Sequence, residues 1–237
     1  MNARTKTTLI TGAGRRLGFA LGQALLNEGY QVIAHYHSSA AGVAELVAQG
    51  AVALQADLAD LTQVRQLIQQ VQQLAPQLDL LINNASCFFD NDKVATSDEH
   101  LQAVFSVHTM APYLLMEQLT PQLTQAQGCV INLTDIYVES PNPQYIAYCA
   151  AKAGLANLTL SFAKKLAPAV RVNAIQPGPI LFLPEHESDY RQQVLAETPL
   201  QLEGGLEPVI QAMRLLRDNP FITGESIKVD GGRALLI

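Results

Sequence analysis

Tyr148 and Lys152 are the residues whose types and spacing most clearly suggest acid–base chemistry. Side chains four residues apart lie on one face of a helix, so the phenol and the ammonium group would face each other. A free tyrosine has a pKa of about 10 and exchanges protons slowly at neutral pH, whereas a neighbouring ammonium group stabilises phenolate and lowers that pKa. The pair therefore predicts a catalytic tyrosine tuned by a lysine. The alternative is a surface tyrosine and a surface lysine without a shared role.

Asp135 lies thirteen residues before Tyr148, just after the apolar segment Cys129–Leu133. A carboxyl group in an apolar site has a raised pKa and can hold and deliver a proton. Such a donor suits the reduction of a ring C=N bond, whose nitrogen takes up a proton as hydride reaches the adjacent carbon. Two alternatives stay open. Thr134 could instead supply an ordinary hydroxyl, and His108 could relay protons or be a satisfied interior histidine.

A glycine-rich turn joins the first apolar segment of the chain to the first predicted helix. Its sequence is Thr11-Gly12-Ala13-Gly14-Arg15-Arg16-Leu17-Gly18. Glycines let the backbone approach a pyrophosphate closely, and the N-terminus of the following helix supplies N–H donors and positive potential. A purely structural turn is the alternative. As a phosphate cradle, the turn would bind a dinucleotide through Gly12, Arg15, Arg16, Leu17 and Gly18.

The end of the second apolar segment distinguishes between the two nicotinamide dinucleotides. An Asp or Glu there accepts a hydrogen bond from the ribose 2′-hydroxyl of NAD and repels a 2′-phosphate. The residues at this point are His35-Tyr36-His37-Ser38-Ser39, with no acid. Donors at His37, Ser38 and Ser39, together with the cation of Arg16, suit a 2′-phosphate. We therefore predict NADPH as the cofactor, with solvent-facing turn residues as the alternative.

Short apolar segments alternate with helical stretches from one end of the chain to the other. The predicted strands are Thr7–Thr11, Gln31–Tyr36, Ala51–Gln55, Leu78–Asn83, Cys129–Leu133, Val170–Ile175 and Ser226–Val229. The predicted helices are Arg16–Glu28, Ala40–Gln49, Leu61–Leu74, Asp98–Leu123, Tyr145–Leu166, Ser188–Ala196 and Glu207–Arg217. Strands joined by helices in this way form right-handed βαβ units, with a parallel sheet that is covered on both faces.

This alternation predicts an α/β fold, a single doubly wound Rossmann domain over residues 1–237 with a seven-stranded parallel sheet flanked by helices. The carboxyl ends of parallel strands meet at one edge of a sheet. That edge would bring together the glycine turn, the His35–Ser39 segment and the catalytic pair. Residues 177–202 contain several prolines and interrupt the alternation, so we expect them to form a substrate lid.

Composition excludes several classes of protein. Of the 237 residues, 49% are hydrophobic and 15% are charged, which is unlike a disordered chain, and the net charge of −6 argues against a dedicated nucleic-acid binder. The three cysteines form no C-x-x-C pair, so neither a disulfide framework nor a metal site is expected. Because no apolar run is long enough for a signal peptide or a membrane span, we expect a cytoplasmic protein with no membrane partner.

Several of these motifs resemble the short-chain dehydrogenase/reductase family. The glycine turn is similar to the family's T-G-x-x-x-G-x-G motif, and the spacing of Tyr148 and Lys152 matches its Y-x-x-x-K. The resemblance extends over nearly the whole chain. Asp135 stands where the family normally has a serine, Ser86 where it has a glycine, and His108 where it often has an asparagine.

These departures are similar to those of the pteridine reductase branch of the family, including its bacterial dihydromonapterin-reducing members. The turn that contains Arg16, the segment His35–Ser39 and the segment Asn84–Phe88 all resemble that branch. Ser38 stands where an arginine is usual in the branch, which removes one expected contact to a 2′-phosphate. The catalytic set of the branch is matched by Asp135, Tyr148 and Lys152.

The resemblance implies contacts that spacing alone does not. In the family, the lysine that matches Lys152 holds the nicotinamide ribose, and the acid that matches Asp57 contacts the adenine. Cofactor contacts are further implied for Leu58, Asn84, Ala85, Ser86, Tyr148, Pro177 and Gly178. Substrate contacts are implied for Arg16, Ser86, Phe88, Asp135 and Tyr148, with the Phe88 ring stacked on a pterin.

The implied activity is NADPH-dependent reduction of a dihydropterin, such as 7,8-dihydromonapterin or dihydrofolate, to the tetrahydropterin by hydride transfer to the ring C=N bond. One alternative is a short-chain carbonyl reductase that acts on a ketone or a 3-oxoacyl substrate. Another is a non-catalytic NADPH-binding regulator, which the presence of both Tyr148 and Lys152 disfavours. Because the family is usually tetrameric, with helices Asp98–Leu123 and Tyr145–Leu166 at one interface, we also expect a homotetramer.

Overall fold

The computed structural model describes residues 4–183 and 186–237. Within these ranges the chain forms a seven-stranded parallel sheet with the strand order β3-β2-β1-β4-β5-β6-β7. The strands are β1 (Thr7–Ile10), β2 (Gln31–Tyr36), β3 (Val52–Gln55), β4 (Leu80–Asn83), β5 (Cys129–Leu133), β6 (Arg171–Pro177) and β7 (Ser226–Val229). The predicted α/β fold with a parallel, seven-stranded Rossmann-type sheet is confirmed.

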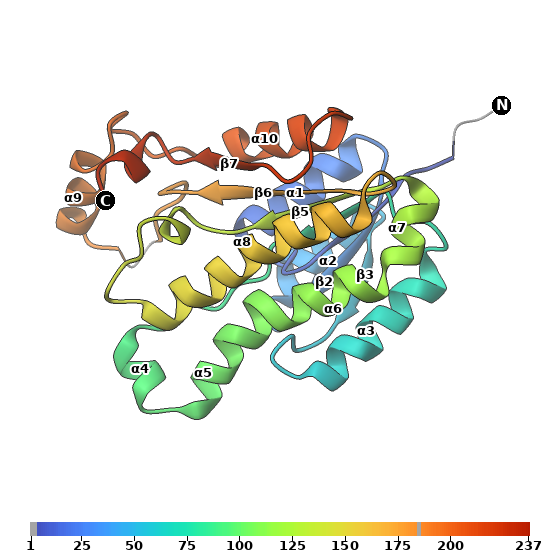
Figure 1. Cartoon of the computed structure of the whole chain (residues 1–237), viewed down its shortest axis with the longest axis horizontal. Helices are drawn as coiled ribbons and strands as arrows, with labels where there is room; N and C mark the ends of the chain where they lie inside the picture. Colours follow the sequence, from blue (N-terminus) through green and yellow to red (C-terminus); the bar gives the residue numbers. More distant parts are fainter. Residues whose placement is uncertain (1–3, 184–185) are drawn as a thin grey trace.

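Helices cover both faces of this sheet, as Figure 1 shows. One face packs against α1 (Arg16–Asn27), α2 (Ala40–Ala48) and α10 (Glu207–Asp218). The other face packs against α3 (Leu61–Leu74), α6 (Ala111–Gln118) and α8 (Ile146–Leu166). Further helices are α4 (Asn91–Ala95), α5 (Asp98–Phe105), α7 (Thr120–Ala126) and α9 (Ser188–Ala196).

The two faces are built by alternating side chains along each strand. Leu9 and Leu81 point into the core beneath α3, α6 and α8, whereas Ile10 and Ile82 point into the core beneath α1 and α10. All four are fully buried, and each such burial stabilises the fold by about 1.5–3 kcal/mol. Both sheet faces are therefore largely apolar, as a parallel sheet covered on both sides requires.

The predicted helix Asp98–Leu123 is wrong as a single element. The structure divides this stretch into α5, one turn of π-helix over Ser106–Met110 (here called the π-turn), α6 and α7. Pro112 accounts for the first interruption, because it has no N–H to offer the carbonyl of His108 and its ring would clash with that carbonyl in a regular helix. Pro121 has the same effect at the end of α6. The other predicted elements are present, with ends that differ by at most two residues.

Residues 177–202, predicted as a lid, include the end of β6, an irregular stretch and α9. Pro184 and Glu185 of this segment lie outside the described residues. Arg191 of α9 donates hydrogen bonds to the carbonyls of Leu183 and His186, so the described part of the segment is held together internally. Among the described helices, none is long and apolar enough to cross a membrane.

Candidate active site

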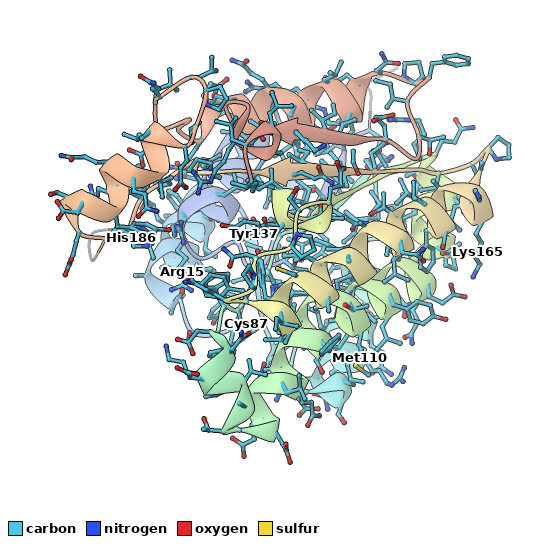
Figure 2. The ribbon with its side chains drawn as sticks, turned by 60° about the vertical axis from the view of Figure 1, so that its left-hand side comes forward. Arg15, Cys87, Met110, Tyr137, Lys165 and His186 are labelled. Atoms are coloured by element: carbon cyan, nitrogen blue, oxygen red, sulfur yellow. The ribbon has the colours of Figure 1, made fainter. Side chains whose placement is uncertain are left out.

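A cleft of about 520 Å³ opens at the carboxyl ends of the strands. The strand order reverses at β1, which pairs with β2 on one side and with β4 on the other. The cleft lies at this point of reversal. Ligands of doubly wound sheets bind at such a switch point. Figure 2 shows Arg15, Cys87, Tyr137 and His186 at this end of the molecule and Lys165 at the far end of α8. A larger hollow of about 670 Å³ lies at the opposite edge of the sheet and contains none of the predicted site residues.

Most of the predicted site residues line this one cleft, although they come from the ends of six strands and from two helices. They are Gly12, Arg15, Arg16, Leu17, Gly18, His37, Ser38, Ser39, Asp57, Leu58, Asn84, Ala85, Ser86, Asp135, Tyr148, Lys152 and Pro177. Gly178 and Phe88 do not line it. A Cβ at Gly178 would lie 2.6 Å from the Cβ of Asp230, so this glycine is required by close packing against the segment after β7.

The glycine turn is held in shape by both of its neighbours in the sheet. Gly12 has a φ of +67°, which favours glycine, and a Cβ on Gly18 would lie 2.2 Å from the carbonyl oxygen of Gly12. Asn84, after β4, donates through Nδ2 to the carbonyls of Thr11 and Gly12 at 2.9 and 3.1 Å. The turn is therefore pre-shaped, with the N-terminus of α1 directed at the cleft.

Arg16 adopts an unusual backbone conformation within the turn. Its φ is +51°, in the left-handed region that costs a non-glycine residue of order 1 kcal/mol. Its guanidinium donates to the carbonyl oxygen of Leu181 at 3.3 Å. Arg16 thus links the phosphate cradle to the segment after β6, and its cation faces the cleft beside that of Arg15.

His35, at the end of β2, fastens the same turn from the other side. Its Nδ1 accepts from the N–H of Gly12 at 3.2 Å, and its Nε2 lies 3.0 Å from the carbonyl oxygen of Ala56. Since a carbonyl only accepts, Nε2 carries the hydrogen and the ring is neutral. Burial lowers the pKa of His35 to about 4, in agreement with a neutral ring. Sequence reasoning included His35 in the cofactor turn but gave it no role, and the signal was a polar residue in an otherwise apolar strand.

The three predicted catalytic residues are brought together by β5 and α8. The hydroxyl of Tyr148 donates to Oδ2 of Asp135 at 2.7 Å, and Oδ1 of Asp135 accepts from the N–H of Tyr137 at 2.9 Å. Lys152 is 3% exposed and donates through Nζ to the carbonyl oxygen of Leu133 at 2.7 Å. Its Nζ lies 5.7 Å from the centre of the Tyr148 ring. The helical spacing of four residues therefore places the phenol and the ammonium group side by side, as predicted.

A family model described as enoyl-(acyl carrier protein) reductase matches residues 12–234, nearly the whole chain. The chain belongs to the short-chain dehydrogenase/reductase family. A protein of Enterobacter sp. (strain 638) named dihydromonapterin reductase is 37% identical to this family member over 237 residues, 99% of each chain. One from Escherichia coli O6:K15:H31 with the same name is 36% identical over 230 residues, 96% of each chain.

Solved structures of the family include close matches to this fold. The crystal structure of FolM alternative dihydrofolate reductase 1 from Brucella canis, complexed with NADP, has a TM-score of 0.87 and 34% identity. The match covers 97% of this chain and 94% of that chain. The corresponding Brucella suis protein, also in complex with NADP, has the same TM-score and 33% identity, covering 99% of this chain and 97% of that chain.

The direction of the pKa shift at Tyr148 corrects the prediction from sequence. Burial and the neighbouring Asp135 carboxylate raise the pKa of Tyr148 well above 10, although Lys152 had been expected to lower it. The physical reason is that the Lys152 ammonium is directed at the Leu133 carbonyl, whereas the phenol proton is directed at Asp135. Burial also lowers the pKa of Lys152 to about 8. In this short-chain dehydrogenase/reductase the raised pKa favours the neutral phenol of Tyr148, whose hydroxyl donates a hydrogen bond to Asp135.

Asp135 shows the shift that the sequence predicted. Burial raises the pKa of its carboxyl above the usual range, against the opposing effects of the Tyr137 N–H, the Tyr148 hydroxyl and the charge of Lys152. Thr134, the alternative source of a hydroxyl, is buried and donates to the carbonyl oxygen of Ile175 at 3.1 Å. Its hydroxyl is thus used within the sheet, which favours Asp135 as the residue that faces Tyr148.

Phe88 lies beside Tyr148, outside the cleft lining. Its ring centre is 4.8 Å from that of Tyr148, edge to face, and 4.4 Å from that of Tyr145. The side chain is 51% exposed, so about half of its surface is open to solvent. Its predicted stacking on a substrate stays a prediction.

Several residues that sequence reasoning did not assign also line the cleft: Gly14, Cys87, Phe89, Ala103, Val107, Ile180, Leu181 and Leu206. Most are apolar, and they form the part of the wall against which a flat ring could pack. Burial raises the pKa of the Cys87 thiol to about 11, which makes it an apolar wall residue and a poor nucleophile. Within the described residues, no cluster of three or more potential metal ligands is present.

Proposed function

We propose that this protein catalyses the NADPH-dependent reduction of a dihydropterin, such as 7,8-dihydromonapterin, to the corresponding tetrahydropterin. The observation that carries the proposal is the 2.7 Å hydrogen bond between Tyr148 and a carboxyl group whose pKa is raised, at the base of a cleft built for a dinucleotide. A hydroxyl in place of Asp135 could polarise a carbonyl, but only an acid can also hold a proton for a ring nitrogen. The names of the Enterobacter and Brucella relatives support the same reaction.

The chemistry of the donor set fits NADPH. The turn after β2 provides His37, Ser38 and Ser39 at the cleft and contains no acid that would repel a 2′-phosphate. Arg15 and Arg16 supply positive charge next to the N-terminus of α1, which suits the pyrophosphate. Asp57, at the end of β3, would contact the adenine, Lys152 the nicotinamide ribose, and the complexes of both Brucella proteins with NADP support this choice of cofactor.

The mechanism that follows assigns proton supply to the chain's own residues. The bound NADPH supplies the hydride that adds to C6 of the dihydropterin. Asp135, when protonated, donates its proton to the Tyr148 oxygen, and the Tyr148 hydroxyl turns its proton toward N5 of the ring. Lys152 anchors the end of β5 through Leu133. Its positive charge acts against the rise that burial causes in the pKa of Asp135.

A substrate panel tests this proposal. The purified protein is assayed with NADPH against 7,8-dihydromonapterin, 7,8-dihydrobiopterin, dihydrofolate, simple ketones and a 3-oxoacyl thioester. We expect turnover of the dihydropterins, with dihydrofolate a poorer substrate. Efficient reduction of ketones or of the thioester without any turnover of dihydropterins would show a carbonyl reductase instead. No NADPH oxidation with any of them would favour a regulatory dinucleotide-binding protein.

The cofactor assignment has its own test. NADPH and NADH are titrated separately against the protein, and binding is followed by the fluorescence of the reduced nicotinamide. We expect NADPH to bind about tenfold more tightly or better, a difference of roughly 1.4 kcal/mol, because the 2′-phosphate gains charge-assisted hydrogen bonds. Comparable affinities would contradict the role given to His37, Ser38 and Ser39.

We further propose that the protein is a cytoplasmic homotetramer. The helices expected at one interface carry exposed apolar side chains, namely Leu101, Met110, Tyr113, Ile146 and Leu160, each at least 40% exposed. A monomer gains nothing by leaving such side chains in water, whereas a second copy could cover them. All three cysteines are free thiols, which suits a reducing compartment.

A further inference from the structure

Ser86 and His108 form a hydrogen bond that links the cleft to the interior. Ser86 follows β4, is exposed and lines the cleft, whereas His108 belongs to the π-turn and is 1% exposed. The Oγ atom of Ser86 lies 3.0 Å from Nε2 of His108. The other ring nitrogen, Nδ1, lies 2.8 Å from the carbonyl oxygen of Val104. Both nitrogens of the buried ring are therefore engaged.

These two contacts decide where the protons are. The Val104 carbonyl can only accept, so Nδ1 of His108 carries a hydrogen. Burial and the positive charge of Lys152 lower the pKa of His108 well below 6.5, which leaves the ring neutral with a single N–H. Nε2 therefore presents a lone pair. The Ser86 hydroxyl must be the donor of the bond to His108.

Tyr148 and Lys152 are the titratable groups that face His108 across the same pocket. The Tyr148 ring meets the imidazole edge to face, with centres 5.2 Å apart, and its hydroxyl is bonded to Asp135. The Lys152 charge disfavours imidazolium. The Nδ1 hydrogen of His108 is held by the Val104 carbonyl, which cannot take up a proton, so the geometry argues against the relay that the sequence left open.

A serine hydroxyl has one proton and two lone pairs. Because its proton is committed to His108, the exposed Ser86 oxygen can only accept from a bound ligand. We propose that His108 is a positioning residue that turns Ser86 into an acceptor-only contact, so that the cleft selects an N–H donor of the ligand at this point. Such a donor is an amino or ring N–H of a pterin, or the amide N–H of the nicotinamide.

The proposal rests on the proposed function only for the choice between these two ligands. A carbonyl oxygen placed at Ser86 would face a second acceptor without a proton between them, an arrangement that leaves two polar atoms unpaired. A ligand with an N–H there gains a hydrogen bond that a freely rotating serine would provide less reliably. His108 thereby affects specificity without touching the ligand.

The proton positions can be measured directly in the protein without ligand. Nitrogen-15 NMR of protein labelled at histidine distinguishes the two neutral tautomers from imidazolium. We expect His108 to be neutral with the hydrogen on Nδ1, and His35 to be neutral with the hydrogen on Nε2 as an internal reference. His35→Gln and His108→Phe assign the signals. A cationic His108 at pH 7, or one protonated on Nε2, would overturn the proposal.

A double-mutant cycle tests the consequence for binding. Ser86→Ala, His108→Phe and the double variant are compared for NADPH affinity by fluorescence and for the KM and kcat of a dihydropterin. We expect Ser86→Ala to weaken one of these ligands about tenfold, the contribution of one hydrogen bond. His108→Phe should weaken the same ligand by a smaller factor, because Ser86 can still accept but its hydroxyl is no longer held. Because His108 acts through Ser86, adding His108→Phe to Ser86→Ala should weaken binding no further. Weaker NADPH binding identifies the nicotinamide amide, and a raised KM alone identifies the pterin.

Two results would overturn the role of His108. One is unchanged affinity for both ligands in Ser86→Ala, and the other is an equal loss from His108→Phe in both backgrounds. His108→Asn, which is polar but too short to reach Ser86, is a second variant, and thermal unfolding of each variant verifies its fold. If dihydropterins prove not to be substrates, the NMR measurement and the NADPH titration still decide the proposal.

Discussion

Carboxyl groups in this protein differ according to their surroundings. Asp60 and Asp90 cap helices at the surface, and hydrogen bonds to these carboxylates lower their pKa values. Asp135 also caps a short turn through Tyr137, yet burial reverses the direction and raises its pKa. The same residue type therefore has a lowered pKa in one place and a raised pKa in another.

Replacement of Asp135 tests its role as a proton source. Asp135→Asn keeps an oxygen for the Tyr137 N–H but cannot transfer a proton, and Asp135→Ser restores a hydroxyl. We expect both to lower kcat for a dihydropterin by about 10² or more, since general acid catalysis contributes that much, with NADPH affinity nearly unchanged. Equal losses in turnover and in NADPH binding would mean that Asp135 is structural. Tyr148→Phe should abolish detectable NADPH oxidation.

The pH dependence of the same reaction tests the direction of the pKa shift at Asp135. A protonated Asp135 is the active form, so kcat/KM should fall as the pH rises through its raised pKa. In Asp135→Asn this decline should disappear from the residual activity. A profile that is identical in both proteins would assign the proton to another group.

Among the elements of the fold, the glycine turn depends on contacts made by its neighbours. β2 contributes His35, β4 is followed by Asn84, and the segment after β6 contributes the carbonyl of Leu181. The backbone of the turn is therefore fixed before any ligand arrives, which reduces the entropy lost on binding. The π-turn acts similarly by placing His108 beneath Ser86.

Gly18→Ala should abolish most NADPH binding. Its Cβ would lie 2.2 Å from the Gly12 carbonyl oxygen and 2.5 Å from Nδ2 of Asn84, so the cradle must open. Gly29→Ala is the matched control, because its φ of +80° makes alanine strained but nothing lies within 4 Å of the new Cβ. We expect it to cost about 1 kcal/mol of stability and to leave NADPH affinity intact. Fluorescence titration and thermal unfolding of both variants distinguish the two effects.

At the scale of the whole molecule, buried neutral histidine links folding to pH. The pKa of His35 is about 4 in the folded protein and near 6.5 in the unfolded chain, so the unfolded chain binds a proton first as the pH falls. Stability is therefore fully present above about pH 6.5 and declines toward pH 4, by roughly 3 kcal/mol for this group. Urea unfolding from pH 7.5 to pH 4.5 measures the decline. His35→Gln should reduce the slope of unfolding free energy against pH by about the amount that uptake of one proton produces. An unchanged slope would contradict the low pKa assigned to His35.

The oligomeric state is the second prediction at this scale. Light scattering coupled to size exclusion should give the mass of four copies. Leu160→Glu places a charge on the exposed surface of α8, where Leu160 is 49% exposed, and should yield smaller species that remain folded. A wild-type mass of one copy of 25.6 kDa would refute the assembly.

The sequence by itself determined the fold class and the location of the site. Apolar segments alternating with helical stretches specify a parallel sheet, and parallel strands collect their following turns at one edge. Local spacing also suffices for Tyr148 and Lys152, because four residues on a helix always share a face. Pro112 is also visible in the sequence. Whether it widens one turn or ends the helix depends on how α6 packs.

Only the tertiary structure decided where the protons of the site point. The phenol of Tyr148 is directed at Asp135 and Lys152 at Leu133, which reversed the predicted pKa shift of the tyrosine. His35 and His108 are fixed in opposite tautomers by carbonyl groups of Ala56 and Val104. These outcomes depend on burial and on contacts of about 3 Å, most of them between segments distant in the chain. A local pattern of residues predicts neither the burial nor these contacts.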